Sequence, residues 1–302
     1  MDRRGFLTTG LAAGAAAVSA QGMQLVSSSS KKTFKQKYAP HFGMFKNAAG
    51  KDPIDQLKFA ADQGFMAWED NGMMNKPKDL QERIAKTMEN LGMTMGVFVS
   101  YADFNNPTFV KKDKAFRSTI TQRMKQAIEV AKRVNAKWST VVPGAYHKGI
   151  EWDYQTANCI DTLKYCAEVC EPAALVLVLE PLNPWANHPG CFLTKISQAY
   201  QICRAVGSPS VKILDDLYHQ QITEGNLIPN MEMAWDEIAY IQMGDNPGRK
   251  EPTTGEINYK NVFKWIYEKG YKGVLGMEHG NSKPGTEGES KVIQAYRECD
   301  SF

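Results

Sequence analysis

The chain has 302 residues, of which 43% are hydrophobic and 23% are charged, and its formal net charge is +3. This composition is ordinary for a soluble globular protein, and the small net charge argues against a nucleic-acid or acidic-membrane partner. A single barrel of eight strand–helix units, which needs roughly 250 residues, would use most of the length.

The first twenty residues resemble an export signal. The stretch Asp2-Arg-Arg-Gly-Phe-Leu7 carries a twin-arginine pattern, an Ala- and Gly-rich segment follows, and Val18-Ser-Ala20 offers small residues for cleavage. We expect a twin-arginine signal peptide at residues 1–20, a Ser- and Lys-rich linker at 21–37 and the barrel domain at 38–302. The alternative is an uncleaved anchor, but the segment is too short and too rich in Gly and Ala to span comfortably. The sequence therefore predicts a periplasmic protein with no stable membrane span after cleavage.

From Pro40 onward, short apolar runs alternate with amphipathic stretches at a period of roughly 30 residues. The expected strands are His41–Phe45, Gly64–Glu69, Met93–Val99, Lys137–Val142, Leu175–Leu179, Val211–Asp216, Ile238–Gln242 and Gly273–Glu278. The expected helices are Ile54–Gln63, Leu80–Leu91, Phe116–Val134, Tyr154–Cys170, Ile196–Val206, Met231–Glu237, Tyr259–Lys269 and Val292–Arg297.

This pattern predicts an α/β fold, a single (β/α)8 TIM barrel. A doubly wound open sheet is the rival, but no Gly-x-Gly-x-x-Gly follows the first expected strand, and the uniform period favours closure.

The chain contains six cysteines and no Cys-x-x-Cys pair, which argues against thiolate zinc and thioredoxin chemistry. Cys159, Cys166 and Cys170 recur at spacings of seven and four within one expected helix, as residues on a buried helical face do. We expect most of the cysteines to be buried thiols.

Four consecutive strands are each expected to end in an oxygen-bearing side chain. Glu180 directly follows the buried run Leu175–Leu179, and the next three strands end at Asp216, Gln242 and Glu278. Parallel α/β folds keep their chemistry at this end of their strands. Each acid could instead pair with a neighbouring basic side chain, but like carboxylates that converge on one rim need a cation. Glu180, Asp216, Gln242 and Glu278 are thus candidate ligands of one divalent cation, Mg2+ or Mn2+ rather than zinc.

Three other residues are candidates for substrate contacts. His219 follows Asp216 by three residues, Arg249 lies in a turn sequence, and Glu69 closes the second strand, where it could line the pocket wall. Each has an alternative reading, as a packing histidine, a solvated loop charge or a residue outside the site. The other four histidines are left unassigned.

The second half of the chain contains several specific motifs: Glu180-Pro-Leu-Asn183, Asp216-Leu-Tyr-His-Gln220, Ile241-Gln-Met-Gly-Asp-Asn-Pro-Gly-Arg249 and Glu251-Pro-Thr-Thr-Gly-Glu-Ile-Asn-Tyr259. These motifs resemble those of the hydroxypyruvate isomerase group within the xylose-isomerase-like TIM barrels, whose relatives include the ketose 3-epimerases and endonuclease IV. The resemblance covers roughly residues 40–300.

The resemblance implies that Glu180 and Glu278 are both metal ligands and the acid–base pair. Asp216 and Gln242 would complete the metal set, with His219 and Arg249 on the substrate. The loop Pro184-Trp-Ala-Asn-His-Pro-Gly190 would cover the pocket and affect the choice of substrate.

The implied function is a metal-dependent isomerase that moves a proton between adjacent carbons of a small α-hydroxy carbonyl compound through an enediolate. The reaction would be of the type that converts hydroxypyruvate to tartronate semialdehyde. The alternatives are a ketose 3-epimerase acting on a free sugar and a non-catalytic exported sugar-binding barrel. A nuclease is disfavoured because the chain has only five histidines and little positive charge. The expected partner is a small hydroxy-carbonyl or sugar substrate, with no nucleic acid, and a homo-oligomer is left open.

Overall fold

The structure is a computed structural model that describes residues 33–302. The predicted signal peptide and the predicted linker up to residue 32 lie outside the described residues. Among residues 33–302, no helix is both long enough and apolar enough to cross a membrane.

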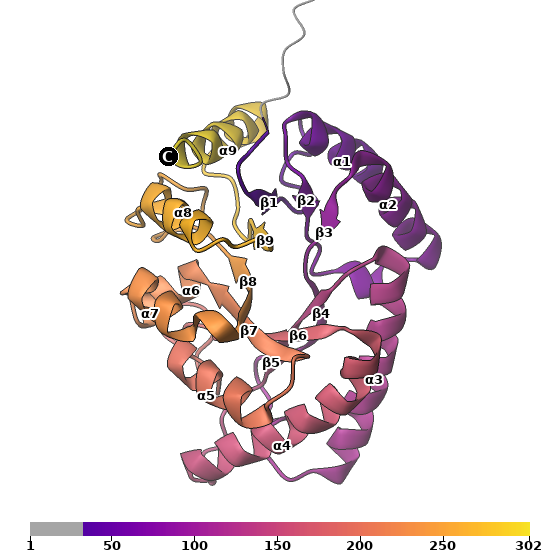
Figure 1. Cartoon of the computed structure of the whole chain (residues 1–302), viewed down its shortest axis with the longest axis vertical. Helices are drawn as coiled ribbons and strands as arrows, with labels where there is room; N and C mark the ends of the chain where they lie inside the picture. The colour runs from indigo at the N-terminus through magenta and orange to yellow at the C-terminus, as the bar shows by residue number, and fades with distance from the viewer. Residues whose placement is uncertain (1–32) are drawn as a thin grey trace, which may run out of the picture. The chain divides into compact units, whose positions relative to one another are not determined.

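Parallel strands form the centre of the fold (Figure 1). They are β1 (Lys37–Ala39), β2 (Ala67–Trp68), β3 (Thr94–Met95), β4 (Phe98–Asp103), β5 (Trp138–Pro143), β6 (Val176–Leu179), β7 (Val211–Asp216), β8 (Ile238–Gln242) and β9 (Val274–Gly276). Seven of them form one sheet in the order β1-β9-β8-β7-β6-β5-β4, and β2 pairs with β3.

The two sheets are joined at both ends. β3 leads through Gly96 and Val97 directly into β4, so these two short strands occupy one position of the barrel. The Glu69 backbone N–H, just after β2, donates to the Pro40 carbonyl oxygen just after β1, at 3.0 Å. These links give the eight strand positions of the predicted (β/α)8 barrel, and the predicted fold class is confirmed.

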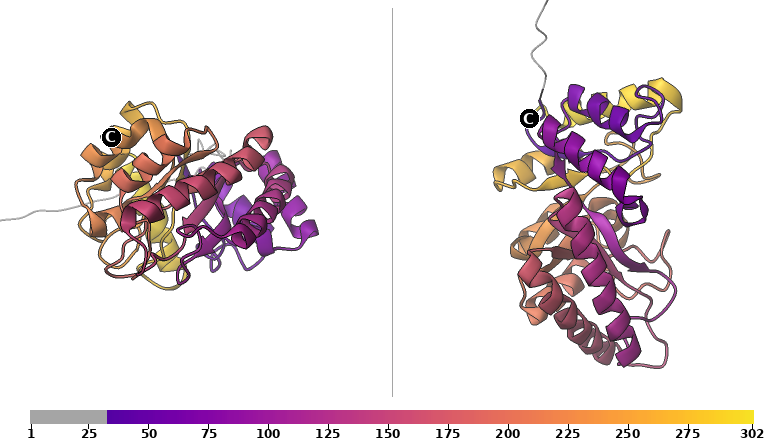
Figure 2. Two further views of the ribbon diagram at one scale, coloured as in Figure 1. Left: turned by 90° about the horizontal axis from the view of Figure 1, so that it is seen from below. Right: turned by 90° about the vertical axis from the view of Figure 1, so that its right-hand side faces the viewer.

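Helices surround the strands (Figures 1 and 2). They are α1 (Pro53–Asp62), α2 (Lys78–Leu91), α3 (Lys114–Val134), α4 (Trp152–Cys170), α5 (Ile196–Val206), α6 (Leu217–Thr223), α7 (Leu227–Ala234), α8 (Tyr259–Glu268) and α9 (Gly285–Cys299), with short 3-10 turns at Met73–Asn75, Glu171–Ala173 and Trp235–Glu237. Capping residues mark the ends of some of these helices. The Asp113 carboxylate accepts from the first free N–H groups of α3, and Gly207 ends α5 with a φ of 68°.

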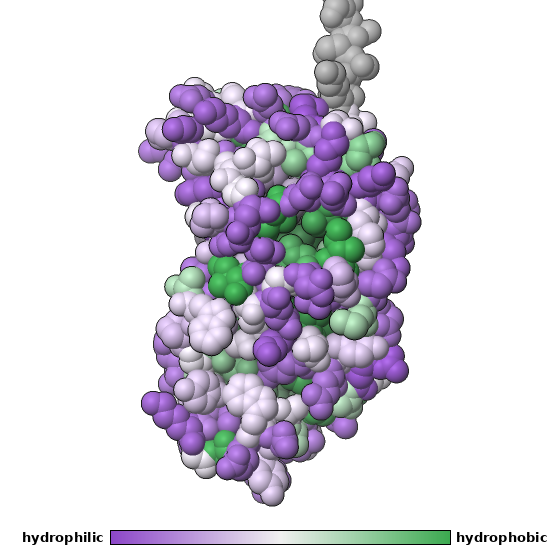
Figure 3. Space-filling model, turned by 90° about the vertical axis from the view of Figure 1, so that its left-hand side faces the viewer, coloured by the Kyte–Doolittle hydropathy of each residue, from purple (hydrophilic) through white to green (hydrophobic). Residues whose placement is uncertain are grey.

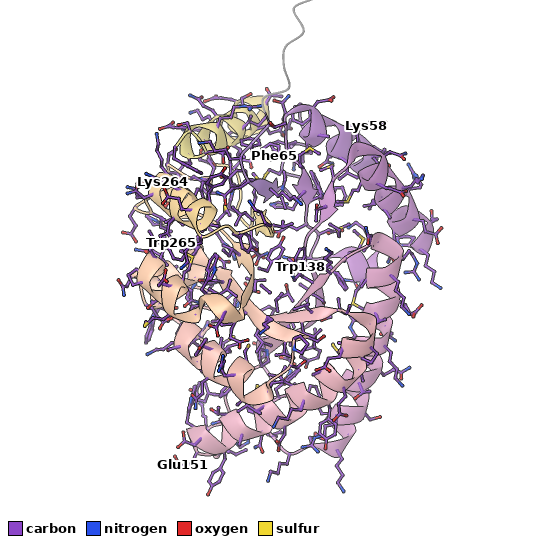
Figure 4. All side chains as sticks on the ribbon, viewed as in Figure 1. Lys58, Phe65, Trp138, Glu151, Lys264 and Trp265 are labelled. Atoms are coloured by element: carbon purple, nitrogen blue, oxygen red, sulfur yellow. The ribbon has the colours of Figure 1, made fainter. Side chains whose placement is uncertain are left out.

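Two of the buried apolar clusters concern the barrel itself, and a third small one consists of Val142, Leu182 and Cys191. The larger barrel cluster lies between the strands and the helices and includes all three cysteines of α4. The smaller barrel cluster lies inside the barrel and consists of Ala39, Ala67, Val97, Val178, Leu214, Tyr240 and Val274. Trp138 packs against this inner cluster. In Figure 4 it lies near the centre of the molecule, whereas Lys58 and Lys264 lie at the periphery of the molecule. The outer face drawn in Figure 3 is mostly hydrophilic, with apolar residues visible in a hollow above its middle and in a few smaller separate spots.

The structure corrects some predicted elements in the first half of the chain. The first strand is Lys37–Ala39, not His41–Phe45, which forms turns. Met44 and Phe45 of that stretch are buried by side-chain packing of a loop, and the Phe45 ring lies 5.4 Å from the Phe59 ring and 5.6 Å from the Phe65 ring. The third strand is divided at Gly96, where the chain changes its pairing partner from β2 to β5.

Other differences concern the sixth helix and the last strand. The segment predicted as one helix at Met231–Glu237 is the end of α7 followed by a 3-10 turn, and a separate helix, α6, precedes it. β9 ends at Gly276, two residues before Glu278. All six cysteines are free and buried, as predicted for most of them.

Candidate active site and metal centre

Three of the four predicted metal ligands follow inner-cluster residues at a spacing of two. Val178 precedes Glu180, Leu214 precedes Asp216 and Tyr240 precedes Gln242. Because side chains alternate between the two faces of a strand, these polar groups point into the barrel directly above the apolar cluster. Asp216 and Gln242 are also register partners of neighbouring strands. Glu180, Asp216 and Gln242 are buried, with exposed fractions of 7%, 0% and 1%.

Arg249 links two of these groups. Its Nη2 atom donates to Asp216 Oδ2 at 2.9 Å and to Glu278 Oε2 at 2.8 Å, and its Nε donates to the Glu278 carbonyl oxygen at 3.0 Å. The loop after β8 holds the arginine, since its backbone N–H donates to the Asp245 carbonyl oxygen and its guanidinium lies over the Tyr218 ring. A positive charge therefore lies between two of the carboxylates.

His219 faces the same carboxylates from the first turn of α6. Its Nε2 atom lies 3.6 Å from Asp216 Oδ2 and 3.9 Å from Glu180 Oε1, and has no hydrogen-bond partner. On the other side of the ring, Nδ1 accepts from the backbone N–H of Asn183 at 3.3 Å. A nitrogen that accepts a backbone N–H carries no proton itself, so in the neutral ring the proton lies on Nε2 and points at the carboxylates.

The donor set fits a divalent cation. Glu180, Asp216 and His219 each offer a ligand atom, and these atoms lie within 4.8 Å of one another. The Gln242 Oε1 atom is buried without a hydrogen-bond partner, as an oxygen reserved for a ligand would be. Buried carboxylates and an amide oxygen are donors suited to hard cations.

The carboxylates have divergent pKa values. Burial, followed by the charges of Glu278 and Asp216, raises the pKa of Glu180 well above its usual range. Burial also raises the pKa of Glu278 to about 7, against the opposing effect of Arg249. The pKa of Asp216 is lowered although it is buried, because His219 and Arg249 favour its charged form. Groups with pKa values pushed apart in this way are typical of acid–base sites.

A cleft of about 420 Å³ opens beside this group. Its lining comes from the loops after β1, β2, β8 and β9: His41, Phe42, Glu69, Asp70, Asn71, Gly72, Arg249, Glu278, His279 and Gly280. Glu69 is among the lining residues, although only 1% of it is exposed. No residue of the loop at 184–190 lines this cleft, and from that loop the His188 ring lies 5.3 Å from the His219 ring and stacks on Phe104.

Two polar residues of the site, Asn71 and Asn183, were not predicted from the sequence to have a functional role. Asn71 Nδ2 donates to Glu278 Oε1 at 2.9 Å, and the Asn183 side-chain amide contacts His219 Nδ1 at 2.7 Å. Asn183 closes one of the motifs quoted above, so its presence there was an available signal. For Asn71 the sequence offered no signal other than its position two residues after Glu69.

Comparisons with known proteins agree with the fold. A family profile described as "Xylose isomerase-like TIM barrel" matches residues 57–299. The chain is 35% identical to hydroxypyruvate isomerase of Escherichia coli over 173 residues, which are 57% of this chain and 66% of that protein, just under two thirds of its length. It is 27% identical to 2-oxo-tetronate isomerase of Pectobacterium atrosepticum over 232 residues, or 75% of this chain and 86% of that protein.

Solved structures show the same fold at lower identity. A crystal structure of AP endonuclease, family 2, from Brucella melitensis superimposes with a TM-score of 0.72 at 22% identity, covering 86% of this chain and 98% of that one. A D-psicose 3-epimerase with D-tagatose from Clostridium cellulolyticum gives a TM-score of 0.67 at 17% identity, with coverages of 87% and 90%.

Proposed function

Because the chain belongs to the xylose isomerase-like TIM barrel family, we propose that it is a divalent-metal-dependent isomerase. It moves a proton between adjacent carbons of a small α-hydroxy carbonyl compound. The curated relatives named as isomerases support the reaction class. The site supports it independently, through the chemistry of its carboxylates.

One observation carries the proposal. Three carboxylates, those of Glu180, Asp216 and Glu278, gather with the Gln242 amide at one rim of the barrel, and Arg249 is the cationic partner that joins two of them. One guanidinium does not balance three carboxylates in a buried site, because each unpaired buried charge is costly. A divalent cation would restore the balance.

Glu180, Asp216, Gln242 and Glu278 would hold this cation, and Mg2+ or Mn2+ suits the oxygen donors. When bound, the cation stabilises the negative charge that develops on the substrate oxygens as a proton leaves carbon. His219 is the other candidate ligand. Its Nδ1 contact with the Asn183 N–H favours a role as a donor instead, because Nε2 then carries a proton.

The two glutamates perform the proton transfer. Burial and then the Glu278 charge raise the pKa of Glu180 well above its usual range, and burial raises the pKa of Glu278 to about 7. One takes the proton from carbon and the other handles reprotonation. Returning the proton to the neighbouring carbon gives an isomerase, and returning it to the same carbon from the opposite face gives an epimerase.

His219 and Arg249 orient the substrate. Burial lowers the pKa of His219 to about 4, so its ring is neutral near pH 7 and can donate from Nε2 to a substrate oxygen. Arg249 lines the cleft and presents a fixed cation to a substrate carboxylate or hydroxyl. A substrate with a carboxylate beside its carbonyl group fits this pair, and hydroxypyruvate, converted to tartronate semialdehyde, is the substrate that we favour.

The epimerase is the second candidate, supported by the fold similarity to a ketose 3-epimerase. The two are separated by one experiment. The protein is stripped of metal, reloaded with Mn2+ or Mg2+, and incubated in D2O with hydroxypyruvate, 2-oxo-tetronate or a free ketose while deuterium incorporation is followed by NMR. Exchange and product formation with hydroxypyruvate support the isomerase, and exchange with inversion of a ketose supports the epimerase. Binding without exchange by any of these compounds contradicts both and supports a sugar-binding barrel.

We also propose export by the twin-arginine route to the periplasm, on the basis of Arg3 and Arg4 and the apolar segment after them. Cell fractionation of the wild type and of an Arg3→Lys, Arg4→Lys double variant tests this. Periplasmic wild type and retained variant support export, and identical distributions contradict it.

A further inference from the structure

A second polar group lies at the rim, around the Gln242 amide and next to the other predicted ligands. The Glu69 carboxylate accepts from the Tyr240 hydroxyl at 3.0 Å, through Oε2. Both of its oxygens face Gln242 Nε2, at 3.2 and 3.3 Å. All three side chains are at most 1% exposed. The buried Glu69 carboxylate therefore accepts hydrogen bonds from two side chains of β8, those of Tyr240 and Gln242.

Two glycines leave the space that this group occupies. A Cβ atom at Gly276 would collide with Glu69 Oε2, and a Cβ atom at Gly96 would collide with the Tyr240 hydroxyl. Neither glycine has a positive φ, so neither is needed for its backbone conformation. Their missing side chains serve the packing of Glu69 and Tyr240.

The carboxylate decides which end of the Gln242 amide faces it. Nε2 of Gln242 donates to both Glu69 oxygens, so the Nε2 end of the amide faces Glu69 and the Oε1 end does not. Oε1 must then point away from Glu69, and it is buried there without a hydrogen-bond partner. Gln242 and Asp216 are register partners on neighbouring strands, so their side chains lie on the same face of the sheet. The Gln242 Oε1 atom is therefore on the face that carries the Asp216 carboxylate.

We propose that Glu69 is a positioning residue, which holds the Gln242 amide so that Oε1 is presented to the divalent cation, and that Tyr240 holds Glu69 in place for this task. The inference rests on the proposed function, because it takes Gln242 as a metal ligand. It assigns Glu69 to the support of the metal site rather than to contact with the substrate.

The replacement of Glu69 by its isosteric amide has a defined consequence. In Glu69→Gln one of the two acceptor oxygens becomes an NH2 donor, so Gln242 Nε2 loses an acceptor and the amide can instead turn Oε1 toward residue 69 and away from the cation. Residues that orient metal ligands commonly change metal affinity by about 10- to 100-fold. We expect Glu69→Gln to weaken Mn2+ binding by about tenfold or more, and Tyr240→Phe to weaken it by a smaller factor.

The test is a double-mutant cycle on Mn2+ affinity, measured by water-proton relaxation on the metal-stripped protein without substrate. The variants are Glu69→Gln, Gln242→Met and the pair together. Glu237→Gln is the matched control, because it makes the same change at a buried glutamate that immediately precedes β8, at the other end of the strand from Gln242. Thermal unfolding of each variant shows that it is folded, and Tyr240→Phe repeats the test without altering a carboxylate.

The proposal requires a loss of Mn2+ affinity in Glu69→Gln that disappears in the Gln242→Met background, with Glu237→Gln unchanged. It is overturned if Glu69→Gln and Tyr240→Phe bind Mn2+ as the wild type does, or if Glu69→Gln costs the same factor in both backgrounds. A wild type that binds neither Mn2+ nor Mg2+ instead contradicts the metal site of the proposed function. If the wild type binds metal but does not exchange deuterium, only the proposed reaction is contradicted. The double-mutant cycle on Mn2+ affinity can still be interpreted.

Discussion

The two halves of the barrel supply different kinds of residues to one rim. The second half, from β6 to β9, provides the carboxylates and the amide of the candidate metal centre. The first half provides residues that hold them: Glu69 contacts Gln242, and Asn71 donates to Glu278. The comparison teaches that reactive and supporting groups can reach one site from opposite sides of a closed barrel, because all strands end at the same rim.

The largest effect is expected in the second half, at Glu180. Glu180→Gln keeps the shape of the side chain but removes both a metal ligand and a proton acceptor, so deuterium exchange should fall by about 10³-fold or more. The measurement is NMR-detected deuterium incorporation in the Mn2+-loaded protein. The control is Glu268→Gln, an exposed residue of α8, which should not change the rate. Exchange within a few-fold of the wild type would remove Glu180 from the chemistry.

The second prediction concerns Arg249, whose positive charge offsets the carboxylate charges of the site when the metal is absent. Arg249→Met leaves buried carboxylates without a cationic partner, so the metal-free protein should lose about 3 kcal/mol of unfolding free energy. The loss should be smaller with saturating Mn2+, since the cation replaces the missing charge. Urea unfolding with EDTA and with Mn2+ measures both values.

The matched control for Arg249 is Arg204→Met, which breaks an exposed pair with Asp236 and should cost under about 1 kcal/mol in either condition. Equal losses for Arg249→Met with and without Mn2+ would mean that the metal and the arginine do not serve the same carboxylates.

A smaller effect is expected for the first half of the barrel. Asn71→Ala removes one hydrogen bond to Glu278 and leaves the carboxylate in place, so the exchange rate should fall by about tenfold. The measurement is the same deuterium assay, with Asn261→Ala on the exposed face of α8 as the control. A loss as large as that of Glu180→Gln would break the distinction between reactive and supporting residues.

The smallest effect is expected outside the rim. The Asp113 carboxylate accepts from the N–H groups of Ala115 and Phe116 at the start of α3. Asp113→Ala should cost about 1 kcal/mol, or roughly 2 °C in melting temperature, and leave deuterium exchange unchanged. A loss of activity without a loss of stability would show that the helical layer also influences the site.

The alternation of apolar runs and amphipathic stretches in the sequence was sufficient to predict the barrel and most of its elements. Val211–Asp216 and Ile238–Gln242 were predicted with the bounds that the structure has. Both runs are apolar, buried and closed by a polar side chain, so their ends are marked locally. The first strand was misplaced because the apolar residues of 41–45 pack from a loop, and packing of that kind has no period that a sequence pattern could reveal.

The sequence also located the rim side chains, because a polar residue after a buried strand falls at the carboxyl end of that strand whatever the rest of the fold does. What those side chains contact was decided by the closure of the barrel. Glu69 and Gln242 are 173 positions apart, yet their side chains meet inside the barrel. Contacts across a barrel depend on which strand faces which, and on glycines such as Gly276 that leave room, and neither is visible in a local pattern of residues.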